Sequence, residues 1–224
     1  MSEQSLETPL FPLYLFKDDF ESVYEPSEDT FVLMDAIEKD LMIIKEMDPL
    51  ICVEVGCGSG AVITSVAKCL DPNKRLYFGT DFNGKALLTT QKCGIVNGID
   101  GCIQLVGTDL TQAIEERLKH SVDLLIFNAP YGPTDPQEVG ISDISSAWAG
   151  GLNGRQVIDR FLRTVPKLLS HNGFCYLIVI KENNINEIKN IMKSLGFEMT
   201  VVLERKTYLE IIIALRFKRL PVIV

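Results

Sequence analysis

The sequence has few of the residues that build metal sites and none of the usual marks of exported or membrane proteins. Its 224 residues include only two histidines, and no two of its six cysteines form a CxxC pair. Zinc sites need such closely spaced ligands, so the pattern argues against a metal and favours reduced thiols in a cytoplasmic, or also nuclear, protein. The first ten residues lack a basic start and an apolar stretch, and no apolar run approaches the ~18 residues of a membrane span.

Positive charge is also scarce. The formal net charge is -8 and the sequence pI is about 4.9. Lysines and arginines are scattered, with only short clusters such as the one at Arg216, Lys218 and Arg219. Proteins that bind duplex DNA or RNA normally show a basic face, because phosphate contacts supply much of the affinity. The charge therefore disfavours nucleic acid as a substrate.

No linker rich in Gly, Pro or Ser divides the chain, and its length of 224 residues suits a single core, since cores stop growing near ~250 residues. We therefore predict one domain over residues 1–224. The domain begins with a helical extension at about residues 20–48, where Ser27 precedes an acidic turn and an apolar-periodic run. A serine in that position is typical of a helix N-terminus.

After this extension, runs rich in β-branched residues alternate along the chain with segments of helical periodicity. Predicted strands are Ile51–Val55, Arg75–Thr80, Cys102–Val106, Val122–Phe127, Phe174–Ile180, Glu198–Leu203 and Tyr208–Phe217. Predicted helices are Ala61–Leu70, Lys85–Asn97, Thr111–Leu118, Gly154–Leu169 and Asn184–Leu195. Such alternation predicts an α/β fold, with a mainly parallel seven-stranded sheet and helices on both faces. A short turn at Glu204–Thr207 joins the last two strands, so one of them must run antiparallel.

A glycine-rich loop closes the first predicted strand and opens the next helix. Glu54 is followed by Gly56, Gly58 and Gly60 in the order E-V-G-C-G-S-G. Glycines let the backbone turn sharply and approach a ligand closely at a helix N-terminus. The spacing G-x-G-x-G differs from the G-x-G-x-x-G of dinucleotide enzymes. A carboxylate in front of it would repel pyrophosphate but attract a cationic sulfonium and amino group, as in S-adenosylmethionine.

Two aspartates follow the next two predicted strands. Asp81 ends the second strand, where a carboxylate can accept hydrogen bonds from ribose hydroxyls. After the third strand, Asp109 could accept from an exocyclic adenine amine, and the backbone N–H of Leu110 could donate to a ring nitrogen. For both aspartates the alternative is a helix N-cap.

The tetrapeptide Asn128-Ala129-Pro130-Tyr131 ends the fourth predicted strand and is the most specific motif. An amide or exocyclic amine nitrogen must lose planarity before it can attack a methyl group. Acceptors for its N–H groups promote this, and here they would be the Asn128 side-chain oxygen and a backbone carbonyl of the tetrapeptide. Tyr131 would offer an aromatic face to the planar group. An ordinary strand-to-loop turn is the alternative, but four motifs in order at successive strand ends disfavour it. The loop that follows, Gly132–Asn153, is long enough to be functional.

The order of these motifs resembles class I methyltransferases that carry an (N/D/S)-P-P-(Y/F/W) signature. Within these it is similar to the release-factor glutamine N5-methyltransferases related to HemK. Three more blocks resemble the eukaryotic and archaeal branch of that family: Val23–Phe31, Trp148–Arg155 and Ile180–Asn184. The resemblance extends from about Phe20 to Phe217. The family pattern is N-P-P-Y, however, and Ala129 replaces the first proline, which keeps the carbonyl but lowers rigidity.

The resemblance implies a Rossmann-like, seven-stranded fold and a catalytic subunit that methylates the glutamine of the Gly-Gly-Gln motif in the translation termination factor. It implies S-adenosyl-L-methionine as methyl donor, with S-adenosyl-L-homocysteine as product, and a small zinc-ribbon activator subunit. Residues matching the cofactor site are Thr30, Glu54, Gly56, Asp81, Asp109, Leu110 and Asn128, and those matching the catalytic amide clamp are Asn128, Pro130 and Tyr131. We expect the activator to add to the sheet at Cys102–Val106, an edge strand in this fold.

Three other functions stay open at this point. The first is an adenine-N6 methyltransferase on DNA or RNA, because adenine and glutamine present the same planar NH2 group. The second is methylation of histone lysine or of a small molecule, in which some members of the family are implicated. The third is a non-catalytic protein that keeps the cofactor pocket while Ala129 has impaired the clamp.

Overall fold

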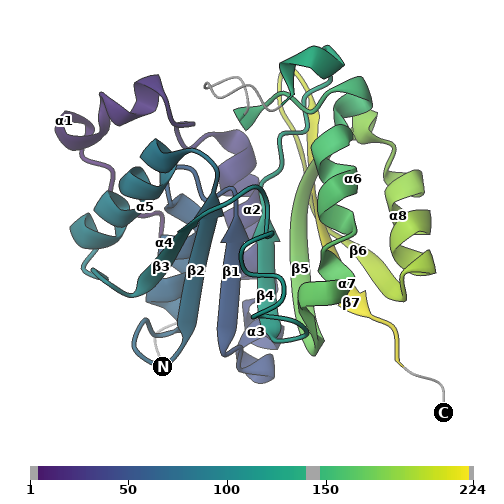
Figure 1. The fold of residues 1–224 in the computed structure, drawn as a ribbon, viewed down its shortest axis with the longest axis horizontal. Helices are drawn as coiled ribbons and strands as arrows, with labels where there is room; N and C mark the ends of the chain where they lie inside the picture. The colour runs from purple at the N-terminus through teal and green to yellow at the C-terminus, as the bar shows by residue number, and fades with distance from the viewer. Residues whose placement is uncertain (1–4, 140–146, 222–224) are drawn as a thin grey trace.

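The computed structural model describes residues 5–139 and 147–221 and forms one seven-stranded sheet (Figure 1). The strand order is β3-β2-β1-β4-β5-β7-β6. All pairs are parallel except β5 with β7 and β6 with β7, so β7 alone is reversed, as a short turn between the last two strands predicts. The turn lies at residues 207–210 and not at the predicted Glu204–Thr207, because β6 continues to Lys206. The strands are β1 Ile51–Val55, β2 Leu76–Asp81, β3 Ile103–Gly107, β4 Val122–Phe127, β5 Leu169–Ile180, β6 Phe197–Lys206 and β7 Ile211–Arg219.

Helices cover both faces of this sheet. The α-helices are α1 Leu13–Phe16, α2 Glu28–Lys39, α3 Leu41–Met47, α4 Ala61–Leu70, α5 Gly84–Val96, α6 Gln156–Leu162, α7 Val165–Leu168 and α8 Ile185–Ser194. The 3-10 turns are η1 Asp19–Glu21, η2 Pro136–Glu138, η4 Leu152–Gly154 and η5 Lys181–Asn183. The architecture is the predicted single α/β domain, and β3 lies at a sheet edge as expected.

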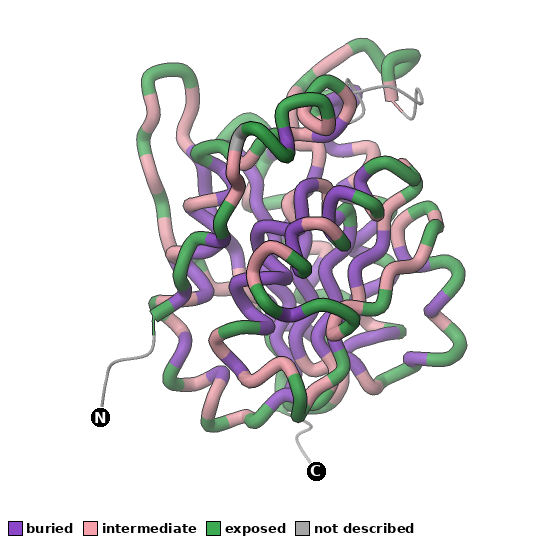
Figure 2. Tube along the Cα trace, turned by 90° about the vertical axis from the view of Figure 1, so that its left-hand side faces the viewer, coloured by how far each residue is buried: buried purple, intermediate pink, exposed green. Residues whose placement is uncertain are grey.

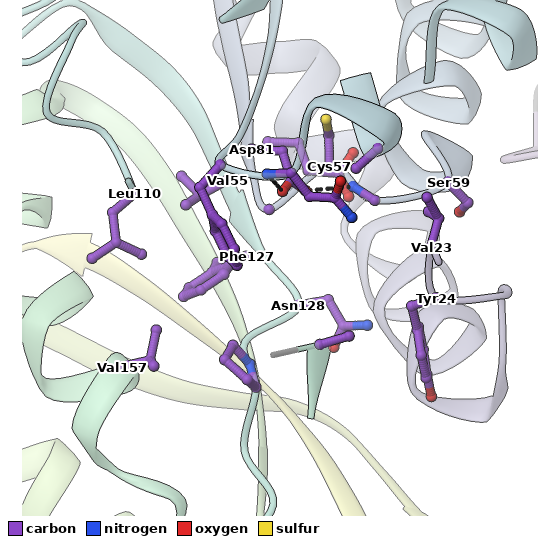
Figure 3. A pocket seen from close by; sticks show the side chains of 18 of the residues that line it. Val23, Tyr24, Val55, Cys57, Ser59, Asp81, Leu110, Phe127, Asn128 and Val157 are labelled. Carbon is purple, nitrogen blue, oxygen red and sulfur yellow. Dashed lines mark hydrogen bonds between the residues drawn. The ribbon is translucent and has the colours of Figure 1, made fainter. Parts of the chain in front are cut away.

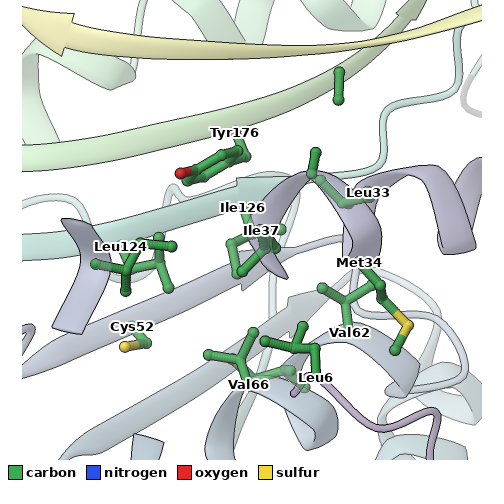
Figure 4. Close-up of a cluster of buried hydrophobic side chains, with 14 of the residues drawn as sticks. Leu6, Leu33, Met34, Ile37, Cys52, Val62, Val66, Leu124, Ile126 and Tyr176 are labelled. Atoms are coloured by element: carbon green, nitrogen blue, oxygen red, sulfur yellow. The ribbon is translucent and has the colours of Figure 1, made fainter. Parts of the chain in front are cut away.

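Two apolar clusters, one on each face, hold the helices to the sheet. In β4, Leu124 and Ile126 join a cluster with α2, α3 and α4 (Figure 4), whereas Leu125 and Phe127 join a cluster with α6, α7 and α8. Side chains alternate across a strand, so a strand buried on both faces is an almost continuous apolar run. Figure 2 shows the buried residues concentrated in this interior, with exposure mainly on outer loops and helix faces.

The predicted helix Thr111–Leu118 is wrong. The segment between β3 and β4 is a series of turns that mixes i→i+3 and i→i+4 hydrogen bonds. Leu110 and His120, which bracket it, both have left-handed φ values of 49° and 54°. Such residues end helices, and the apolar spacing of Ile114 and Leu118 buries the same side chains from turns as it would from a helix.

The predicted helix Gly154–Leu169 is divided into α6 and α7. Thr164 lies at the break, and its Oγ1 donates to the Phe161 carbonyl at 2.8 Å. Pro166, one position inside α7, has no N–H to continue the ladder. The strand that follows starts at Leu169, earlier than the predicted Phe174. The predicted N-terminal extension is likewise two helices, α2 and α3, which meet at Asp40.

Candidate active site

A cavity of about 370 Å³ opens at the carboxyl ends of β1, β2 and β4 (Figure 3). It contains every residue that the sequence assigns to the cofactor: Thr30, Glu54, Gly56, Asp81, Asp109, Leu110 and Asn128. Pro130 of the predicted clamp also lines it. Residues far apart in the chain converge here because the carboxyl ends of parallel strands meet at one edge of the sheet.

The glycine-rich loop has the conformation that its glycines predict. Gly56, Gly58 and Gly60 all have positive φ, at 62°, 51° and 79°. A Cβ on Gly60 would lie 2.8 Å from the Cα of Thr90 in α5, and a Cβ on Gly56 would lie 3.2 Å from the Phe127 ring. Both the backbone conformation and the close packing therefore require glycine.

Glu54 is a buried carboxyl group at the end of β1, with 3% of its surface exposed. Its Oε2 accepts a hydrogen bond of 2.9 Å from the backbone N–H of Ile63, in the first turn of α4. Burial raises the pKa of Glu54 to about 8; this hydrogen bond lowers it, and the nearby Asp81 raises it further. A cationic group in the cavity would favour the ionised form of Glu54, which is the arrangement expected for a sulfonium or ammonium ligand.

Asp81 is not the cap of the helix that follows it. The cap of α5 is Asn83, whose side chain accepts from the Lys85 N–H at 3.0 Å. The Asp81 carboxylate instead accepts from the backbone N–H groups of Gly58 at 3.1 Å and Asn83 at 2.9 Å. It thus ties the glycine loop to the end of β2, while burial raises its pKa.

Asp109 is held by a residue that the sequence did not single out. Its carboxylate forms an ion pair with Arg160 of α6, and both side chains are about half exposed at the rim of the cavity. The capping alternative is wrong here too, because the segment after Asp109 forms turns and not a helix. Leu110 has a left-handed φ, and its carbonyl accepts a hydrogen bond of 2.8 Å from the Thr80 hydroxyl.

The side chain of Asn128 has one satisfied end and one unsatisfied end. Its Nδ2 donates to Asp29 Oδ2 at 3.0 Å, and in Figure 3 this nitrogen points toward the segment that carries Tyr24. Its Oδ1 is shielded from water and has no hydrogen-bond partner among the described residues. Buried acceptors without a partner are rare in native proteins. An unpaired acceptor beside the cavity suits a ligand that brings an N–H group.

Tyr131 lies beside the cavity but is not among the residues that line it. Its hydroxyl donates to Glu210 Oε1 at 3.0 Å, which connects the tetrapeptide to the turn between β6 and β7. Burial, together with the neighbouring carboxylates of Asp29 and Glu210, raises the pKa of the Tyr131 phenol far above its ordinary value. The hydroxyl therefore stays protonated and acts as a hydrogen-bond donor.

Two of the blocks that resemble the family, Trp148–Arg155 and Ile180–Asn184, hold the backbone of the tetrapeptide through hydrogen bonds. Fully buried Asn183 donates from Nδ2 to the carbonyls of Tyr131 and Asn153, both at 2.9 Å. Arg155 donates to the Asn183 carbonyl at 2.9 Å and pairs with Asp159. In the sequence, Asn153, Arg155 and Asn183 belong to the blocks that resemble the family, but nothing local shows that these blocks meet.

The loop after the tetrapeptide is partly described. The Gly132 N–H donates to the Trp148 carbonyl at 2.9 Å, and the Gly132 carbonyl accepts from the Gly150 N–H at 2.8 Å. Residues 140–146, in the middle of the loop Gly132–Asn153 that we expect to be functional, lie outside the described residues. Ala129 is buried, with 2% exposure, in the apolar cluster beneath α6.

Comparison with known proteins gives full-length relatives. Human "Methyltransferase HEMK2" is 44% identical over 98% of this chain and 100% of its own length. The Schizosaccharomyces pombe "eRF1 methyltransferase catalytic subunit mtq2" is 34% identical over 96% of each chain. The chain belongs to the HEMK2/Mtq2 family of methyltransferases.

Solved structures agree with this family. The Mtq2 chain in the "E. cuniculi Mtq2-Trm112 complex", described as responsible for methylation of the eRF1 translation termination factor, superposes with a TM-score of 0.64 at 28% identity. The match covers 88% of the chain described here and 98% of the other. No protein-family model matches the sequence. The predicted class I methyltransferase fold, Rossmann-like with its last strand antiparallel, is therefore confirmed for this HEMK2/Mtq2 family member.

Proposed function

We propose that this chain is the catalytic subunit of an enzyme that methylates the side-chain amide of a glutamine, in the Gly-Gly-Gln motif of the translation termination factor. The methyl donor would be S-adenosyl-L-methionine, and the reaction would leave S-adenosyl-L-homocysteine. The observation that carries the proposal is the buried, unpartnered Oδ1 of Asn128 beside the cavity. The two relatives at 44% and 34% identity, one of them named for eRF1 methylation, support the choice of substrate.

The residues of the cavity fit this cofactor chemically. S-adenosylmethionine would supply an electrophilic methyl group on a cationic sulfonium. Glu54 would offer its buried carboxylate to positive charge, and Asp81 would accept from ribose hydroxyls at the end of β2. Asp109 and the backbone of Leu110 would bind the adenine, with Arg160 holding the Asp109 carboxylate at the rim. Thr30 and the backbone of Gly56 complete the lining.

Asn128 would carry the chemistry of the amide. Its Oδ1 would accept one N–H of the glutamine amide, and a backbone carbonyl of the tetrapeptide would accept the other. These two bonds would draw the nitrogen lone pair out of conjugation and aim it at the methyl carbon. The donor would supply the methyl group and keep the electron pair of the broken C–S bond on sulfur, and water would accept the proton that the nitrogen loses. No strong general base is needed, because the alkylated nitrogen is acidic.

Pro130 and Tyr131 would form the walls of the substrate side of this clamp. Pro130 has a fixed φ and lines the cavity next to Asn128. The Tyr131 ring is anchored at its backbone by Asn183 and at its hydroxyl by Glu210. A ring held at both ends can present one face to a planar amide with little loss of entropy.

We infer as well that a small zinc-ribbon subunit pairs with β3 and forms a heterodimer. Supporting this, β3 is an edge strand and none of its residues is fully buried. The solved relative is itself a complex of Mtq2 with Trm112. An uncovered edge strand invites pairing with another chain. A translation factor as substrate would place the enzyme in the cytoplasm, and we extend the proposal to the nucleus.

The direct test is methyl transfer by the chain co-purified with the activator subunit. The complex would be offered, side by side, a Gly-Gly-Gln release factor, its Gly-Gly-Asn variant, a histone tail and adenine-containing oligonucleotides. We expect methyl only on the glutamine, located by peptide mass mapping. Label confined to the oligonucleotide or to a histone lysine would overturn the proposal. Cofactor binding without turnover, restored by Ala129→Pro, would instead show an impaired clamp.

A further inference from the structure

The amide of Asn128 is held by a carboxylate from a distant part of the chain. Asp29, in the first turn of α2, accepts from Asn128 Nδ2 at 3.0 Å although 99 positions separate the two residues. A carboxylate can only accept hydrogen bonds, whereas an amide has one accepting and one donating end. The pair therefore has a single good arrangement, with Nδ2 facing Asp29 and Oδ1 facing away from it.

We propose that Asp29 is a positioning residue for methyl transfer, which fixes Asn128 so that its oxygen, and not its nitrogen, meets the substrate N–H. This inference rests on the proposed function, because it deepens the role of Asn128 there. Without Asp29, rotation by 180° would exchange the two ends of the Asn128 amide. A donor would then face the donor groups of the substrate, and the nitrogen to be methylated would lose its acceptor.

Asp29 is itself locked in one orientation. Its Oδ1 accepts from the backbone N–H of Thr30 at 2.8 Å and from the hydroxyl of Tyr24 at 3.2 Å. Only Oδ2 is left for Asn128. Asp29 is 5% exposed, so water competes poorly for these bonds. The backbone of α2 thus fixes the orientation of the Asp29 carboxylate, and the carboxylate fixes the orientation of the Asn128 amide.

The same geometry predicts what an isosteric change would do. In Asp29→Asn, the remaining oxygen would keep the Thr30 N–H, and the new NH2 group would take the place of Oδ2. Asn128 would then turn its own oxygen toward residue 29 and its nitrogen toward the substrate. Loss of one well-placed hydrogen-bonding group in an active site lowers turnover by about 10²–10³. We expect kcat for Asp29→Asn to fall by that factor while the cofactor Kd changes less than threefold.

Exchanging the side chains of residues 29 and 128 distinguishes a positioning role of Asp29 from a role of its charge or a role in stability. In the double variant Asp29→Asn/Asn128→Asp, residue 29 would donate to the new carboxylate, whose other oxygen would again face the substrate. We expect this variant to recover at least tenfold of the activity lost in Asp29→Asn. If Asp29 served only as a charge at that position or as a support for α2, the exchange would recover nothing. Glu28→Gln is the matched control, because Glu28 is the exposed neighbour that pairs with Arg205.

The experiment therefore measures kcat, cofactor Kd and thermal stability for the wild type and the three variants, each as the full chain with its activator. A second readout needs no turnover: in protein labelled with ¹⁵N-asparagine, the Asn128 side-chain NH2 should exchange with water at least tenfold more slowly in the wild type than in Asp29→Asn. Full activity of Asp29→Asn, absence of recovery in the exchange variant, or equal exchange rates would each overturn the inference. An inactive wild type would sink the proposed substrate instead, and the NMR result would still decide the orientation of Asn128.

Discussion

At Glu54, burial and ligand charge act on one carboxyl group in opposite directions. Burial raises its pKa to about 8, so in the free protein the neutral form predominates below that pH. A cationic ligand binds best to the ionised form, and binding must then include loss of the proton. Affinity for S-adenosylmethionine should therefore increase from pH 6 to pH 8, by up to about tenfold per unit. Calorimetry at several pH values measures this affinity. Glu54→Gln should bind weakly, with an affinity that hardly changes with pH. A wild-type affinity that is independent of pH would contradict the role of Glu54.

The same shift has a consequence for the stability of the free protein. A carboxyl group whose folded pKa lies above its unfolded value stabilises the fold most below the unfolded pKa, near 4.5. That contribution declines as pH increases and is lost above about pH 8. Thermal unfolding without ligand should thus show Glu54→Gln gaining stability relative to the wild type between pH 6 and pH 8. A constant difference between the two proteins over that range would argue against a buried, proton-binding Glu54.

Asn128 allows binding and chemistry to be separated. We expect Asn128→Ala to keep its cofactor affinity within about threefold and to lose about 10²–10³ in kcat, because the lost acceptor acts on the substrate nitrogen. Single-turnover kinetics and calorimetry on the same preparation would measure both quantities. Unchanged turnover would remove Asn128 from the mechanism.

Ala129 is the position where the chain departs from the family signature. A proline there would restrict the unfolded chain and fix φ next to Asn128, which typically adds ~0.4–1 kcal/mol when the native backbone is compatible. We expect Ala129→Pro to raise the melting temperature by a few degrees and to increase kcat modestly. A fall in stability would show that the backbone here has adapted to alanine.

Among the elements, the strands were the easiest to predict from the sequence, and the segments on either side of β4 were the hardest. Apolar runs such as Val122–Phe127 have only one way to be buried on both faces of a sheet. In contrast, the spacing of Ile114 and Leu118 fits a helix and a series of turns equally well. The break between α6 and α7 falls beside Pro166, but a proline in the first turn of a helix is as compatible with a new helix as with a kink in a continuous one. Local pattern does not distinguish these cases.

The candidate site was predictable to the extent that it lies at strand ends. Glu54, Asp81 and Asn128 follow predicted strands directly, so topology alone brings them together. Asp29 could not be identified in this way, because its partner Asn128 is 99 positions away. Arg160 and Glu210 were missed for the same reason: each acts on a strand-end residue from an element whose placement only the folded chain reveals.

The turn formed by η4 tests whether the support behind the tetrapeptide matters. Gly154 has a φ of 66°, and a Cβ there would lie 1.8 Å from the Tyr131 carbonyl oxygen. Gly154→Ala should push this turn away from Tyr131, with a loss of several kcal/mol in stability and of most activity. Gly98→Ala is the matched control: its φ is 76°, but a Cβ there meets nothing within 4 Å, so only the backbone cost of ~1–2 kcal/mol remains. Equal effects of the two substitutions would show that the contact with Tyr131 is unimportant.

For the molecule as a whole, the open edge at β3 leads to one expectation about solution behaviour. The chain expressed alone should be poorly soluble and weakly active, and co-expression with the activator subunit should give a monodisperse 1:1 complex. Light scattering and specific activity of the two preparations measure this. A monodisperse and fully active isolated chain would count against an obligate partner.

In the described part of the chain, no helix is long and apolar enough to cross a bilayer.

The cavity is closed on one side by residues that precede the first strand. Ser22, Val23 and Tyr24 line it, and the Ser22 carbonyl accepts from Asn83 Nδ2 at 3.0 Å. If this N-terminal segment is docked only part of the time in the free protein, the measured cofactor affinity equals the intrinsic affinity multiplied by the docked fraction. The binding constant is then also a measure of how often the segment around residues 22–30 is docked. Ligand should accordingly slow both amide hydrogen exchange and proteolytic cleavage in that segment, although most of it never touches the reacting atoms.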